Sequence, residues 1–228
     1  MKIMIINPNS SQEMSNAIQT CAEQYAAGDF EVKTVCTPGA PEFIDYYSDQ
    51  AAAAPGMIQL VKEFEDSYDA FIIACHCDPN LDLIKQISKK PVVGIGEASM
   101  HLASMLGSSF SVVSTAKHSI PNKLALVHKY HLDGSCASVR SPKGQTESLS
   151  DMDSYLSAAH TAIDEDDAEV IVLGCAGFAG MSEKMQEKLG VPVLDGIVCA
   201  LIIAQGLVRA DYNISKIRRY QDVSDQNS

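Results

Sequence analysis

The chain has 228 residues with 17 basic and 29 acidic side chains, which gives a formal net charge of −12 at pH 7. This acidic excess argues against partners that carry negative charge, such as nucleic acids and anionic membrane surfaces, and favours a small-molecule substrate. No apolar run approaches the roughly 20 residues of a membrane span, and no cleavage pattern precedes the first expected strand, so we expect a cytoplasmic protein.

The first half of the chain alternates apolar segments with segments of helical spacing. Residues 2–6 and 30–35 predict strands, residues 57–64 predict a helix, and the apolar run 68–75 predicts a buried strand that ends at Cys75. Pro91 and Val92 then mark the next strand, 16 residues after Cys75. Strands that alternate with helices are typical of parallel βαβ units.

The second half repeats this pattern. Residues 168–175 resemble residues 68–75 and also end in a cysteine, Cys175, which lies 100 positions after Cys75. Pro192 and Val193 follow Cys175 after 17 residues, and residues 110–113 and 137–140 predict the first two strands of this half. The repeat predicts an α/β protein with two similar domains, each a mostly parallel sheet flanked by helices.

The domain limits follow from two turns in which the chain is expected to cross between the halves. Residues 94–97 and 192–196 carry glycines, and we expect the first domain to comprise residues 1–96 and 197–228 and the second residues 97–196. A helix over 197–208 would then return to the first domain, and residues 221–228 would form a polar tail.

Two of the seven cysteines are candidates for chemistry, because parallel sheets bind ligands at the carboxyl ends of their strands. Beyond Cys75, we expect Asp78 to cap a helix with Pro79 at its first position, and small residues follow Cys175. Backbone amides and a helix N-terminus stabilise a thiolate, so each thiol is suited to act as a base or a nucleophile.

Four of the other five cysteines are expected to be buried and inert: Cys21, Cys36, Cys136 and Cys199. A zinc site at residues 75–78 is an alternative, but no matching Cys or His pair follows at the spacing of a zinc finger or ribbon. We therefore expect no metal.

Two thiols in equivalent positions suit racemisation. One thiolate removes a proton from one face of a carbon atom and the opposite thiol returns a proton to the other face. The carbon must be activated by an adjacent carbonyl, and the enolate-like charge then requires hydrogen-bond donors.

Five segments, taken in order, resemble the aspartate/glutamate/hydantoin racemase family, and in particular its hydantoin and allantoin racemase branch. These are INPNSS at 6–11, ACHCDP at 74–79, GIGEA at 94–98, FSVVST at 110–115 and LGCAG at 173–177. The resemblance implies two flavodoxin-like domains related by pseudo-twofold symmetry, an active site between them, no cofactor, and Cys75 and Cys175 as acid and base. It also implies a homo-oligomer by analogy.

Several further residues are candidates for substrate contact. Asn9 and Ser10 match the polar pair that follows the first strand in this family, although Ser10 or Ser11 is equally suited to cap the next helix. Ser114 and Thr115 occupy the equivalent place in the second half, where a turn or cap is the alternative role. The candidate set is completed by residues beside the two cysteines: His76, Gly174, Ala176 and Gly177.

The residues after the cysteines bear on the substrate. Amino acid racemases of the family commonly place a hydroxyl residue after each active cysteine, and His76 and Ala176 depart from that pattern. The resemblance therefore favours a 5-substituted hydantoin or allantoin. The alternatives are an aspartate/glutamate-type amino acid racemase, a related isomerase or decarboxylase, and a small-molecule binding protein without catalysis.

Overall fold

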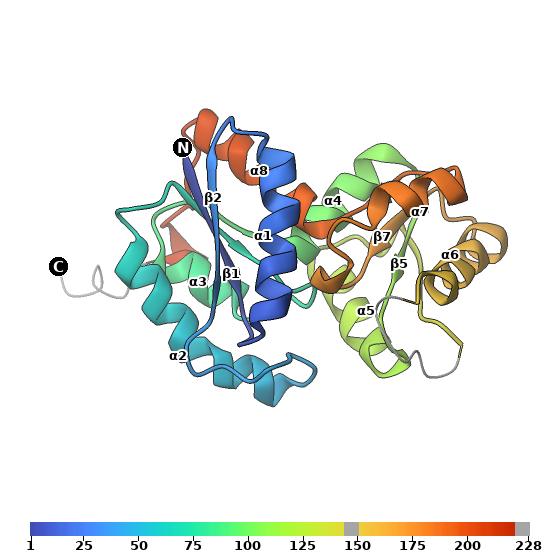
Figure 1. Ribbon diagram of the computed structural model, residues 1–228, viewed down its shortest axis with the longest axis horizontal. Helices are drawn as coiled ribbons and strands as arrows, with labels where there is room; N and C mark the ends of the chain where they lie inside the picture. The colour runs from blue at the N-terminus through green and yellow to red at the C-terminus, as the bar shows by residue number, and fades with distance from the viewer. Residues whose placement is uncertain (144–150, 222–228) are drawn as a thin grey trace. The chain divides into compact units, whose positions relative to one another are not determined.

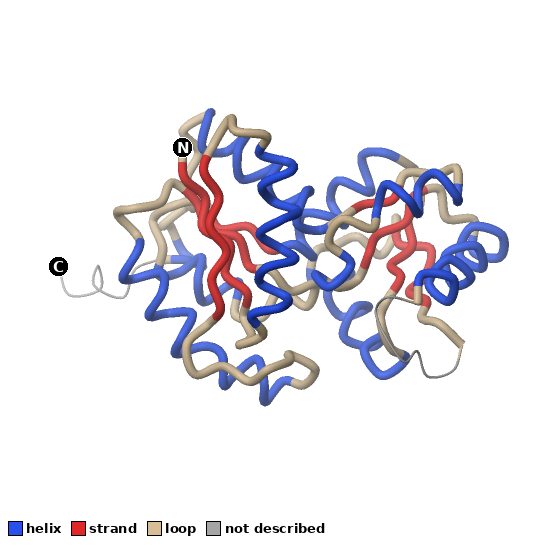
Figure 2. Tube along the Cα trace, viewed as in Figure 1, coloured by secondary structure: helices blue, strands red, loops and turns tan. Residues whose placement is uncertain are grey.

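The computed structural model describes residues 1–143 and 151–221. Its contacts divide the chain into two compact units, Met1–Gly94 with Ala200–Ser228, and Ile95–Cys199. Within each unit the strands form an inner layer and the helices lie outside it (Figure 2). The predicted α/β class with two similar parallel sheets is confirmed.

The sheet of the first unit has four parallel strands in the order β2-β1-β3-β4 (Figure 1). The strands are β1 (Lys2–Asn7), β2 (Glu31–Cys36), β3 (Ala70–Ile73) and β4 (Val92–Gly94). β1 after Lys2 and the whole of β3 are buried. Their sequences do not alternate between polar and apolar residues because helices cover both faces of a central parallel strand.

The helices of the first unit are α1 (Gln12–Ala26), α2 (Tyr47–Phe64), α3 (Leu81–Ile87) and most of α8 (Gly196–Arg209), followed by the short helix η3 (Arg218–Tyr220). Side chains of β1 and β3 pack against α2 and α3 on one face, and α1 lies on the other (Figure 1). Ser11 caps α1 by accepting a hydrogen bond from the Met14 amide at 3.3 Å. Of the two caps that the sequence allowed, the structure therefore uses Ser11 rather than Ser10.

The second unit has the same strand order, β6-β5-β7-β8, and all of its strands are parallel. The strands are β5 (Phe110–Val113), β6 (Cys136–Arg140), β7 (Val170–Leu173) and β8 (Val193–Leu194). The helices are α4 (Ile95–Leu106), η1 (Lys117–Ser119), α5 (Ile120–Lys129), α6 (Met152–Asp166), η2 (Ala176–Phe178) and α7 (Ser182–Leu189).

The core of the second unit lies where α6 and α7 pack on the sheet. Tyr155 of α6 and Phe178 of η2 are each 1% exposed, and their rings meet edge to face with centroids 4.7 Å apart. Met185 of α7 and Leu173 of β7 complete this contact in the same cluster. Burial of large apolar side chains of this kind is the main stabilising contribution to the unit.

None of the helices within residues 1–143 and 151–221 combines the length and the apolar character that crossing a membrane requires. The polar tail expected at 221–228 lies, apart from Gln221, outside the described residues.

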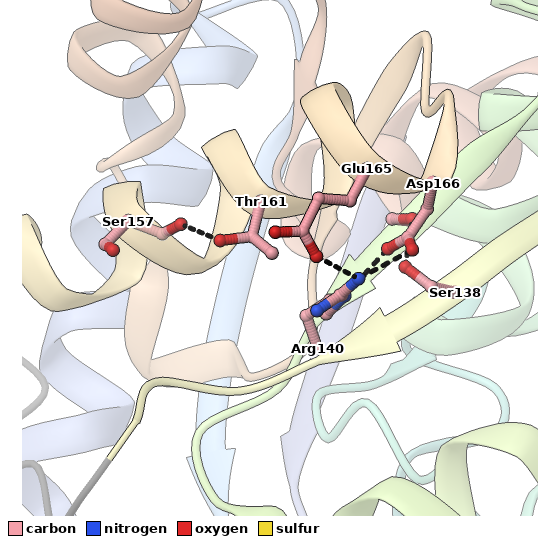
Figure 3. Close-up of polar contacts among 7 residues, drawn as sticks. Ser138, Arg140, Ser157, Thr161, Glu165 and Asp166 are labelled. Atoms are coloured by element: carbon pink, nitrogen blue, oxygen red, sulfur yellow. Dashed lines mark hydrogen bonds and ion pairs between the residues drawn. The ribbon is translucent and has the colours of Figure 1, made fainter.

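An ion-pair cluster joins the edge strand β6 to the end of α6 (Figure 3). The Arg140 guanidinium donates from Nε to Asp166 Oδ2 at 2.7 Å and from Nη2 to Asp166 Oδ1 at 2.6 Å, and Nη2 also reaches Glu165 at 3.2 Å. The hydrogen bonds from Arg140 hold the pKa of the Asp166 carboxyl below its usual value. A two-point pair of this kind fixes the edge strand against the helix.

We expect Asp166→Asn to lower the free energy of unfolding by about 1 kcal/mol at pH 7, because it removes a partly buried two-point ion pair. The pKa of Asp166 is depressed in the folded state, so the pair stabilises fully above the unfolded pKa of about 3.9, and this stabilisation is lost as the pH falls through the folded value. Urea denaturation of variant and wild type between pH 3 and pH 7 measures this difference. The matched control is Asp164→Asn, an exposed carboxylate on the same helix; equal stability of the two variants at pH 7 would contradict the prediction.

Candidate active site

Each sheet has a point at which the strand order reverses. The chain runs from β1 to the edge strand β2 and then returns to β3 on the other side of β1, and β5, β6 and β7 repeat this path. The connections from β1 and β3 therefore leave the sheet in opposite directions, and in open α/β sheets ligands bind at the carboxyl ends of two such strands. The equivalent position in the second unit is at the ends of β5 and β7.

Cys75 and Cys175 follow these switch-point strands in the same way. The Ala74 amide donates to the Ile6 carbonyl at 2.9 Å, and the Gly174 amide donates to the Val113 carbonyl at 2.8 Å. In each unit the cysteine is the next residue and is half-buried. The sequence repeat therefore corresponds to a repeat in structure, and each cysteine follows the carboxyl end of the equivalent strand in its own sheet.

The chain turns sharply after Cys75. The Asp78 amide donates to the Cys75 carbonyl at 2.9 Å, and Asp78 adopts a left-handed φ of 44°. Within this turn the sulfurs of Cys75 and Cys77 lie 3.2 Å apart.

The predicted helix start after Cys75 is wrong. Helix α3 begins at Leu81, with Asn80 rather than Asp78 at the N-cap position. Asp78 is only 4% exposed, and its carboxyl group packs so closely on Gly94 of β4 that a Cβ there would lie 2.3 Å from Oδ1. This contact and the left-handed φ at Asp78 move the start of α3 further along the chain from Cys75. The dipole of α3 therefore stabilises a Cys75 thiolate less than the sequence indicated.

The loop after Cys175 has the small residues and the nearby amide that the sequence predicted. The Gly177 amide donates to Cys175 Sγ at 3.3 Å, and Cys175 is the N-cap residue of η2. Ala176 is 5% exposed and Gly177 is half-buried. A donor at this place stabilises the thiolate form of Cys175.

Gly174 has a packing role that the sequence did not reveal. A Cβ at this position would lie 2.8 Å from the Val113 carbonyl oxygen and 3.1 Å from Cγ1 of Val112. Glycine therefore lets β7 approach β5 closely just before Cys175, and contact of Gly174 with substrate stays a prediction.

The polar residues that follow β1 form a hydrogen-bonded cluster. Asn9 Oδ1 accepts from Asn7 Nδ2 at 2.7 Å and from the Ser11 amide at 2.9 Å, whereas Asn9 Nδ2 donates to the sulfur of Met14 at 3.3 Å. Asn9 is 4% exposed, and Ser10 is exposed with its amide bound to the Pro41 carbonyl. Asn9 thus shapes the loop, and its amide nitrogen has a weak acceptor that a carbonyl oxygen can replace.

The equivalent residues after β5 serve largely as a turn. Ser114 is buried, and its hydroxyl oxygen lies 2.5 Å from that of Ser119, which in turn donates to the Ala116 carbonyl at 2.8 Å. Thr115 is half-buried in the loop before η1. The turn role that the sequence left open for Ser114 is therefore present, and substrate contact by Ser114 or Thr115 stays a prediction.

His76 lies between the two thiols of the turn and is 1% exposed. A side chain this buried is held by the protein interior and contributes shape to the loop. The proposed contact between His76 and substrate remains a prediction.

The other cysteines divide into two groups. Cys21 and Cys199 are buried as predicted, and burial raises the pKa of Cys199 to about 12. Cys36 and Cys136 are half-buried, so the prediction was wrong for these two; Cys36 Sγ lies 3.0 Å from the Ser15 hydroxyl oxygen. Burial still raises the pKa of the Cys136 thiol to about 11, which keeps it protonated at neutral pH.

Cys77 is the residue whose proximity to the site the sequence analysis missed. The sequence shows that Cys77 lies two residues after Cys75, but it does not show that the chain turns there and brings the two sulfurs together.

Within residues 1–143 and 151–221, no group of three or more His, Cys, Asp or Glu side chains is arranged to hold a metal ion.

Comparison with known proteins identifies the family. The Asp/Glu/Hydantoin racemase family model matches residues 3–204, which span both sheets and both cysteines. The chain belongs to this family.

The similarity to individual members of the Asp/Glu/hydantoin racemase family extends over nearly the whole chain. A hydantoin racemase of Pseudomonas sp. (strain NS671) is 35% identical, with 97% of this chain and 91% of the relative covered. A hydantoin racemase of Paenarthrobacter aurescens is 34% identical, with 97% of each covered. The solved structure of an allantoin racemase from Klebsiella pneumoniae superposes with a TM-score of 0.92 at 30% identity, covering 97% of this chain and 93% of that one.

Proposed function

We propose that this protein is a racemase of 5-substituted hydantoins or allantoin and that it uses Cys75 and Cys175, without a cofactor, as its two proton-transfer groups. The observation that carries the proposal is the equivalent placement of the two thiols, each directly beyond a buried strand at the switch point of its sheet. The names of the family relatives support the reaction class.

The chemistry requires one thiolate and one thiol at a time. One cysteine, as thiolate, takes the proton from the ring carbon beside the carbonyl group, and the other, as thiol, gives a proton to the opposite face. The two groups exchange roles for the mirror-image substrate. Gly177 supports the thiolate form of Cys175 through its amide hydrogen bond of 3.3 Å.

The enolate-like intermediate needs donors placed where charge develops. We propose that Asn9 Nδ2 serves a substrate carbonyl, because its present acceptor is the weakly accepting sulfur of Met14. The backbone of Ala176 and Gly177, and the side chains of Ser10, His76, Ser114 and Thr115, complete the proposed substrate contacts.

A cyclic ureide is the preferred substrate class for two reasons. The residues that follow the cysteines, His76 and Ala176, lack the hydroxyl group that amino acid racemases of the family commonly place there. The two curated relatives and the solved structure described above, each of which aligns with 97% of this chain, are named hydantoin or allantoin racemases.

The test is loss of optical activity by single enantiomers of several 5-substituted hydantoins, allantoin, aspartate and glutamate, incubated with reduced protein after dialysis against a chelator. We expect racemisation of at least one cyclic ureide and none of the amino acids. Racemisation of aspartate or glutamate alone would assign the amino acid substrate class instead, and no racemisation by folded, reduced protein would contradict the proposal. Light scattering of the same sample tests the homo-oligomer expected by analogy.

A further inference from the structure

Cys77 has no part in the proposed proton transfer, although its thiol lies beside that of Cys75. Cys77 Sγ lies 3.2 Å from Cys75 Sγ, both residues are half-buried, and both thiols are reduced in the structure. Two sulfurs at this distance need only approach by about a further 1.2 Å to reach the length of a disulfide bond.

The backbone permits such a bond. The Asp78 amide binds the Cys75 carbonyl at 2.9 Å, so residues 75–78 form a turn rather than an extended segment. A turn brings the Cα atoms of residues two apart closer than the roughly 7 Å of a fully extended chain, within the span that a disulfide bridges.

We propose that Cys75 and Cys77 form a reversible oxidation site, in which hydrogen peroxide converts the two thiols to a disulfide. The Cys75 thiolate attacks one peroxide oxygen, the O–O bond breaks, and the sulfur becomes a sulfenic acid while hydroxide leaves. Cys77 sulfur then attacks the Cys75 sulfur, the S–S bond forms, the S–O bond breaks, and the thiol proton of Cys77 leaves with the hydroxyl group as water. The two thiols lose two electrons in total, and the peroxide is reduced to two molecules of water.

The disulfide is expected to be easily reduced. Its ring closes through a single intervening residue, His76, which constrains the geometry of the bond, and strained disulfides have the more oxidising potentials typical of labile sites. Added thiol therefore restores the reduced pair. Cys77 in this role also protects Cys75, because a sulfenic acid captured as a disulfide does not proceed to the irreversible sulfinic acid.

The effect on catalysis rests on the proposed function. If Cys75 is an acid and base, its capture in a disulfide stops racemisation, and the activity falls in proportion to the fraction of molecules oxidised. The disulfide itself is independent of that function, since it depends only on the two sulfurs and the turn.

Peptide mass spectrometry tests the site directly. Trypsin cleaves after Lys62 and Lys85, and the peptide 63–85 contains Cys75 and Cys77 and no other cysteine. After brief treatment with hydrogen peroxide and alkylation, we expect this peptide to be lighter by two hydrogen atoms and unalkylated, and to regain two alkylation sites after dithiothreitol. In Cys77→Ser the same peptide gains oxygen instead, and in the control Cys136→Ser it behaves as in wild type.

Activity recovery provides a second measurement. Wild type and Cys136→Ser are expected to recover their racemase activity when dithiothreitol is added. Cys77→Ser is expected to be active before treatment, but the fraction of its activity that dithiothreitol fails to restore grows with the time of exposure to hydrogen peroxide. Absence of the lighter peptide 63–85 in wild type would overturn the proposal, even if the protein is an active racemase. An inactive protein that forms the disulfide would instead contradict the proposed function and leave the oxidation site in place.

Discussion

Cys75→Ser and Cys175→Ser are each expected to lower kcat/KM for racemisation by about a thousandfold or more. A serine hydroxyl does not ionise near neutral pH, so it cannot replace a thiol as a proton donor and acceptor. The equilibrium constant between two enantiomers is one, so kcat/KM must fall by the same factor in both directions. Chiral chromatography started from either enantiomer measures both rates.

The matched control for these variants is Cys136→Ser. Cys136 is half-buried in β6, and its pKa is raised to about 11 by burial, so it takes no part in proton transfer at neutral pH. We expect its activity to equal that of wild type. If Cys75→Ser or Cys175→Ser retained more than about a tenth of wild-type activity, the cysteine replaced in that variant would be excluded as an acid or base.

Phe178→Ala is expected to lower the free energy of unfolding by about 3–5 kcal/mol, the usual cost of removing a large aromatic side chain from a packed core. Phe178 is 1% exposed and packs edge to face on Tyr155 with centroids 4.7 Å apart. It also ends η2, and its amide donates to the Cys175 carbonyl at 3.2 Å. Loosening this loop removes the fixed position of the Gly177 amide, so we expect kcat/KM to fall as well.

Chemical denaturation followed by circular dichroism measures this change. The control is Phe43→Ala, since Phe43 is 55% exposed and its truncation is expected to change stability by less than about 0.5 kcal/mol. A difference between the two variants of less than about 1 kcal/mol would show that Phe178 does not hold the core of the second unit.

The strands were predictable because burial leaves a direct mark on sequence. β3 and β7 read as uninterrupted apolar runs ending before a cysteine, and the repeated spacing to the following Pro-Val pair identified both sheets. The five segments that resemble the racemase family were recognisable in the sequence because each lies at or beside the end of a buried strand: β1, β3, β4, β5 or β7. The domain limits and the substrate contacts stay predictions.

The turn after Cys75 was not predictable from local sequence. Asp78 and Pro79 have the residue types of a helix start, yet the tertiary contact of Asp78 with Gly94 competes with capping and places the start at Leu81. The same turn brings Cys77 to Cys75, a proximity that depends on backbone dihedrals rather than on residue type. The hydrogen bonds of Asn9 in the loop after β1 were likewise not predictable. Their partners, Asn7 and Met14, are placed beside Asn9 by the fold.

The most direct test of two-thiol racemisation is NMR in deuterated water with single enantiomers of the substrate and each single-cysteine variant. The remaining thiolate can take a proton from one face of the carbon and return a deuteron, after exchange with solvent, to the same face. We predict that Cys75→Ser exchanges the α-proton of one enantiomer without inversion and that Cys175→Ser exchanges only the other. Exchange of the same enantiomer by both variants, or of both enantiomers by either one, would contradict the assignment of one thiol to each face.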